Sequence, residues 1–175
     1  DSFLGLAEVE MSETSVDANN HDIDVSPELR AYDAFNSLST RLPITRSEGV
    51  LTALASPRGS FIYGRSVGFD LAYGPHIVNK EAALWVGVDP HSIKNSGGSR
   101  SMVWAKLRDS FSELKYFMDN QKAVANGNGR ELSLSYNKLV ALKNFMQSND
   151  PLVIEANRLS DIKNVVEFNS YLKRY

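Results

Sequence analysis

The stretch SFIYGRSVGFDLAYG, residues 60–74, decides the fold of this chain. Apolar residues alternate there with polar or small ones, at Val67, Phe69, Leu71 and Tyr73, which is typical of a strand with one buried face. The preceding segment VLTALASPRG (50–59) joins an apolar run to a turn signal, because Pro57 suits the second turn position and Gly59 the fourth. Together the two segments predict a β-hairpin with a long, half-buried second arm.

Downstream of the hairpin, the pattern predicts more strands and then helices. HIVN (76–79) and AALWVGV (82–88) are two strand candidates, and residues 89–100 read as a loop. Apolar residues at spacings of three and four then predict helices over 101–124 and 135–148. LVIEA (152–156) is a short strand candidate, and a last helix begins at Ser160.

Upstream of the hairpin, a helix is expected over residues 27–42. Ser26 can cap it, Pro27 suits its first position, and Pro43 ends it. The order of helix, strand block, two helices, strand and helix predicts an α+β fold, in which an antiparallel sheet of four to five strands packs on helices.

Composition limits the class of protein. The 175 residues are 42% hydrophobic and 23% charged, with no cysteine, so disulfides and cysteine-ligated metals are excluded. Residues 1–28 carry eight acidic residues and no lysine or arginine, which predicts an acidic N-terminal arm over 1–25 and a single domain over 26–175. Bases are scattered through the rest of the chain, so no nucleic-acid partner is expected.

The strand block offers candidate ligand-binding residues. Tyrosine and tryptophan supply flat contact area, and arginine offers a fork for a carboxylate. We therefore consider a small-molecule site at Tyr63, Arg65, Asp70, Tyr73, His76 and Trp85. The alternative is that these side chains only pack across the strands or lie on the surface.

Catalytic and metal motifs are not recognised in the sequence. The three histidines have no helical metal-binding spacing, so no catalytic residue, metal or cofactor is predicted. A hydrolase or transferase that uses His76, His91 and Asp89 stays open as an alternative. The loop NSGGSRSM (95–102) could hold an anion through its amides and Arg100, or could be a plain connector.

The segment LTALASPRGSFIYGRS (51–66), with the preceding helix, resembles the strand–turn–strand unit of PAS-like Cache domains, the extracytoplasmic sensors of bacterial membrane receptors. The resemblance implies a non-catalytic periplasmic ectodomain, a small-molecule or protein signal, a homodimer, and membrane attachment only through segments outside this chain. The start at Asp1 rather than Met agrees with an excised or processed segment. The alternative is a protein-interaction or assembly module of an envelope or secretion machine.

Overall fold

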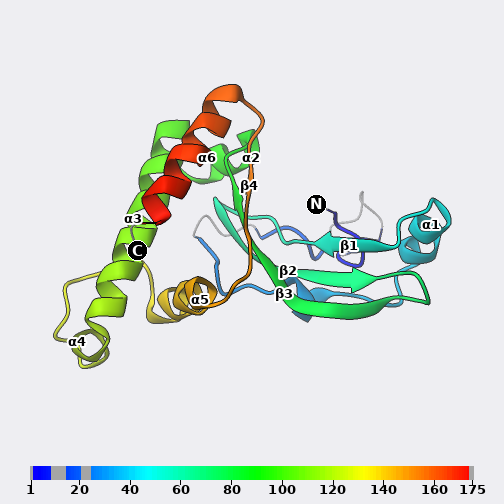
Figure 1. The fold of residues 1–175 in the computed structure, drawn as a ribbon, viewed down its shortest axis with the longest axis horizontal. Coiled ribbons are helices and arrows are strands. Elements are labelled where there is room, and N and C mark those ends of the chain that lie inside the picture. Colours follow the sequence, from blue (N-terminus) through cyan, green and yellow to red (C-terminus); the bar gives the residue numbers. More distant parts are fainter. Residues whose placement is uncertain (1, 9–14, 21–24, 174–175) are drawn as a thin grey trace.

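The computed structural model describes residues 2–8, 15–20 and 25–173. Figure 1 shows a sheet with most of the helices gathered at one end and one short helix at the opposite end. In chain order the elements are the 3-10 helix η2 (Ala31–Ala34), α1 (Arg41–Ser47), β1 (Thr52–Ala55), β2 (Ile62–Asp70), β3 (His76–Gly87), α2 (Pro90–Asn95), α3 (Arg100–Asp119), α4 (Gln121–Ala125), α5 (Tyr136–Gln147), β4 (Leu152–Glu155) and α6 (Leu159–Leu172).

Within the described residues, the sheet has four strands in the order β1-β2-β3-β4. β1 and β2 pair antiparallel, as do β2 and β3, which confirms the expected hairpin and the α+β class. β4 pairs parallel with β3, with Leu84 opposite Leu152, so the sheet is mixed rather than wholly antiparallel. Helices α2, α3, α4 and α5 lie between these two strands in the chain and supply the long crossover that a parallel pair needs.

The helix expected over 27–42 is wrong. A register shift between Ile62 and Gly64 interrupts the β2–β3 ladder, and the segment before η2 pairs with the start of β2 instead. The Ser26 amide donates to the Ile62 carbonyl at 3.1 Å, and the Arg65 amide donates to the Leu29 carbonyl at 2.7 Å. These bonds hold the chain out of a helix there.

Pro43 does not end a helix, because it lies in the first turn of α1, between Arg41 and Ser47. The first amides of a helix have no partner within it, so a proline costs little at that position.

Two other boundaries differ from expectation. The two predicted strands at 76–79 and 82–88 form one continuous strand, β3. The predicted loop at 89–100 contains α2, because the Asp89 carboxylate caps that helix by accepting from the Ser92 amide at 2.7 Å.

The buried residues form a large cluster and two smaller ones. The large cluster joins β2, β3, α3 and α5, and includes Ile62, Leu84 and Phe111. The second joins β1 and β2 to Leu6 and Ala18 of the N-terminal segment. Among the helices of the described residues, none has the length and apolar character that crossing a membrane requires.

Candidate functional site

Polar side chains gather at one edge of the sheet. Because β2 is antiparallel to both β1 and β3, and β4 is parallel to β3, strands β1, β3 and β4 all point the same way. Their carboxyl ends therefore share an edge, and Arg58, Asp89 and Glu155 lie at or just after those ends. β2 begins at the same edge and brings Tyr63 there. These four residues and Ser92 of α2 are called the strand-end cluster below.

The inner part of the strand-end cluster is a buried hydrogen-bond network. The Tyr63 hydroxyl oxygen lies 2.7 Å from the Ser92 hydroxyl oxygen. The same Tyr63 hydroxyl donates to the Asp89 carboxylate at 3.5 Å. All three residues are buried, so the network fixes the end of β3 relative to the start of β2.

Burial raises the pKa of Tyr63 well above its usual value, since the charged phenolate would lose its water. The hydrogen bond with Ser92 and the positive charge of Arg58 oppose this rise, and the negative charges of Asp89 and Glu155 add to it. Tyr63 is therefore protonated at neutral pH and serves as a hydrogen-bonding hydroxyl rather than as a base.

Gly87 makes room for this network. A Cβ atom at Gly87 would lie 1.8 Å from the Tyr63 hydroxyl oxygen and 2.3 Å from the Ser92 hydroxyl oxygen. No larger residue fits without moving both groups. The last residue of β3 is thus a glycine because the network passes over its Cα.

The outer part of the strand-end cluster is a partly exposed ion pair. Arg58 Nη2 lies 3.4 Å from Glu155 Oε1, and the two side chains are 30% and 24% exposed. Among the described residues, Glu155 Oε2 has no hydrogen-bond partner although it is shielded from solvent. The guanidinium of Arg58 also lies 5.2 Å from the ring centroid of Phe3. Glu155 therefore has one oxygen held by a cation and a second oxygen whose lone pairs are not used by any described residue.

The structure does not bring the six candidate ligand residues into one pocket. Tyr63 and Trp85 belong to a small buried cluster with Ala83 on one face of the sheet. Arg65 is opposite Leu84, whose side chain faces the helices, so Arg65 lies on the other face. Asp70, Tyr73 and His76 lie at the far end of the hairpin, where Tyr73 is 98% exposed.

The other sequence candidates are dispersed as well. His91 is exposed and contacts Asn95 at 3.0 Å, away from His76. Asp89 alone of that alternative set is in the strand-end cluster. The segment 95–102, predicted to be a loop, is one only over 96–99, and Arg100, the first residue of α3, donates to the Asp161 carboxylate at 3.0 Å. No group of three or more histidines and carboxylates within residues 2–8, 15–20 and 25–173 is placed to hold a metal ion.

Sequence reasoning missed Arg58, Ser92 and Glu155. A usable signal was present, since a charged residue follows the apolar part of β1 and ends the apolar run of β4. That signal becomes informative only when the three strands are known to point the same way.

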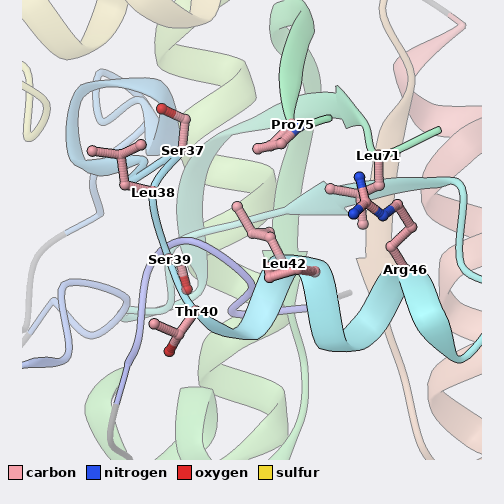
Figure 2. A pocket seen from close by; sticks show the side chains of 9 residues that line it. Ser37, Leu38, Ser39, Thr40, Leu42, Arg46, Leu71 and Pro75 are labelled. Carbon is pink, nitrogen blue, oxygen red and sulfur yellow. The ribbon is translucent and has the colours of Figure 1, made fainter. Parts of the chain in front are cut away.

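A cavity of about 330 Å³ lies at the opposite edge of the sheet (Figure 2). Leu42 and Arg46 of α1 line it together with Leu71 and Pro75 of the β2–β3 connection, and Ser39 and Thr40 lie at its other end. Its only charged lining side chain is Arg46. The cavity offers apolar contact and no set of groups for acid–base chemistry.

Comparison with known proteins relates this fold to one solved structure. No family model matches the sequence, and no curated protein matches it significantly. An amidohydrolase from Thermotoga maritima MSB8 has a similar structure, with a TM-score of 0.79 and 20% identity. The match covers 96% of this chain and 46% of that chain. This likeness shows a shared fold, and the chain spans less than half the length of that structure.

The resemblance to Cache sensor domains is wrong, and with it the description as a receptor ectodomain or as an envelope assembly module. After its central helices the chain returns with one strand, β4, which adds parallel to β3. The hairpin at 51–66 that suggested a sensor is a common unit. In this chain it belongs to a mixed sheet in which β4 is parallel to β3.

Proposed function

We propose that this chain is part of a hydrolase that cleaves amide bonds, and that Glu155 is its general base. The fold shared with an amidohydrolase supports the reaction class. The observation that carries the proposal is the second carboxylate oxygen of Glu155, which is shielded from solvent and has no hydrogen-bond partner among the described residues.

The strand-end cluster supplies the groups that amide hydrolysis needs. Once the substrate amide and its attacking water have entered beside Glu155, its Oε2 takes a proton from that water, and the water oxygen attacks the amide carbon. Negative charge develops on the former carbonyl oxygen, where the Arg58 guanidinium can stabilise it. The proton then passes from Glu155 to the amide nitrogen, the C–N bond breaks, and a carboxylic acid and an amine leave.

Tyr63, Asp89 and Ser92 are positioning residues in this scheme. They do not reach solvent, but they fix the end of β3, which pairs with β4 and so places Glu155.

The test is hydrolysis of a panel of small primary and secondary amides by the purified protein, followed by release of ammonia or amine. Glu155→Gln keeps the shape of the side chain and removes the base, so we expect the rate to fall by about 10²- to 10⁴-fold. Glu167→Gln, at an exposed position of α6, is the matched control and should keep the wild-type rate. A Glu155→Gln variant as active as the wild type, or a wild-type protein that cleaves no amide of the panel, would refute the proposal.

A further inference from the structure

A second cavity, polar and of about 440 Å³, lies between α5, the middle of β2 and β3, and the segment before η2. Its charged lining residues are Glu28, Arg30, Asp33, Arg65, Glu81 and Asp150. Asn144 lies at its exposed rim on α5. The volume is in the range of small-molecule sites.

Arg65 forms the buried wall of this cavity. The residue is 5% exposed, and its guanidinium lies 5.2 Å from the ring centroid of Phe145. Its Nη2 donates to the Glu81 carbonyl at 2.7 Å and to the Asp150 carboxylate. The ion pair with Asp150 and the hydrogen bond from Ser148 lower the pKa of Asp150, against the effect of its burial, so Asp150 is charged at neutral pH.

Two of the three guanidinium nitrogens of Arg65 lack a hydrogen-bond acceptor. Its Nη1 and Nε are buried and have no hydrogen-bond partner among the described residues, and Nε only approaches the Glu81 carboxylate at 3.6 Å. A buried guanidinium N–H without an acceptor is costly, so an oxygen from a bound molecule would be stabilised there.

The charge of the cavity limits which molecule can bring that oxygen. Four carboxylates and two guanidinium groups line it, so a simple anion would be repelled by the net negative charge. A molecule with an acceptor at one end and a positive charge at the other satisfies both conditions. We propose that this cavity binds a free amino acid, with its carboxylate toward Arg65 and its ammonium group toward Glu28, because Arg30 already holds both carboxylate oxygens of Asp33 at 3.0 and 2.8 Å.

This amino-acid site is separate from the strand-end cluster. Arg65 faces the helices, whereas Tyr63 packs with Ala83 and Trp85 on the opposite face of the sheet. The inference therefore does not depend on the proposed amide hydrolysis.

Calorimetric titration of the purified protein with each of the twenty L-amino acids tests the site. We expect at least one to bind with a dissociation constant below about 1 mM. Its amide, which lacks the carboxylate, and its N-acetyl derivative, which lacks the ammonium group, should each bind at least tenfold more weakly. The absence of binding by all twenty, or equal binding of both derivatives, would overturn the proposal.

Two variants assign the binding to this cavity. Arg65→Lys removes the planar fork and should weaken binding at least tenfold. Asn144→Trp fills the rim from an exposed helix position and should abolish binding without disturbing the core, even if Arg65→Lys does not fold. Gln147→Trp, on the same helix but outside the cavity, is the control and should bind like the wild type. Binding that survives both Arg65→Lys and Asn144→Trp would show that the site is elsewhere.

Discussion

Tyr63 keeps its proton in the fold at a pH at which an unfolded chain would lose it. The usual pKa of tyrosine is about 10, and burial raises that of Tyr63 above it. Above pH 10 the unfolded state therefore binds fewer protons than the native state, so the free energy of unfolding falls as pH rises. This contribution is complete below pH 10 and is lost above it.

We expect Tyr63→Phe to destabilise the protein by about 1–2 kcal/mol at pH 7, because Ser92 and Asp89 lose the hydroxyl between them. The difference between wild type and variant should shrink between pH 10 and 11, since only the wild type loses the Tyr63 contribution. Urea unfolding of both proteins at pH 7, 9, 10 and 11 measures it. Two stability curves that stay parallel over this range would contradict the raised pKa.

Single residues of the site were only partly predictable. Tyr63 and Arg65 drew attention because polar groups on a strongly β-patterned stretch need partners. Glu155 did not, because one carboxylate at the end of a short apolar run also suits a strand that simply ends at the surface. Its significance comes from Arg58, about 100 residues away in the chain, which only the folded sheet brings near.

Among the elements, α6 forms where a helix is expected but does not bury the side that its apolar residues suggest. The apolar residues Ile162 and Val166 are exposed, whereas Asp161 is 1% exposed. Asp161 is buried because the Arg100 guanidinium at the start of α3 holds its carboxylate at 3.0 Å. An ion pair, together with Phe168, therefore sets how α6 packs, and helical periodicity alone cannot show that.

Truncating either residue of the Arg100–Asp161 ion pair to alanine should lower the free energy of unfolding, but by unequal amounts. Arg100→Ala leaves a buried carboxylate without its cation and should cost about 3 kcal/mol or more. Asp161→Ala should cost less, about 1–2 kcal/mol, because the Arg100 side chain is 27% exposed and can turn toward water. Urea unfolding measures the free energy of unfolding of both variants. A larger loss of stability for Asp161→Ala than for Arg100→Ala would contradict this account.

For the whole molecule, the sequence supports the α+β class and the hairpin, because both depend on local periodicity. The parallel partner of β3 could not be read in the same way. Leu84 and Leu152 are about 70 residues apart, and their pairing depends on how α3 and α5 pack rather than on any turn signal.

The same topology predicts where the molecule opens first. β4 has four residues, all half-buried, and lies at the end of the strand order, whereas β2 is central and almost wholly buried. We expect the amide of Val153 to exchange with deuterium at least tenfold faster than that of Val67. Hydrogen exchange followed by mass spectrometry of peptides from both strands checks this, and equal protection of the two strands would contradict it.

The distance between β3 and β4 along the chain also has a consequence during synthesis. A ribosome adds about 5–20 residues each second, so β4 follows β3 after roughly 3–14 s. During that time the apolar end of β3 is present without its parallel neighbour and without α6. The nascent chain therefore exposes an unpaired, aggregation-prone strand edge for seconds. This is the stage at which a chaperone would contact it.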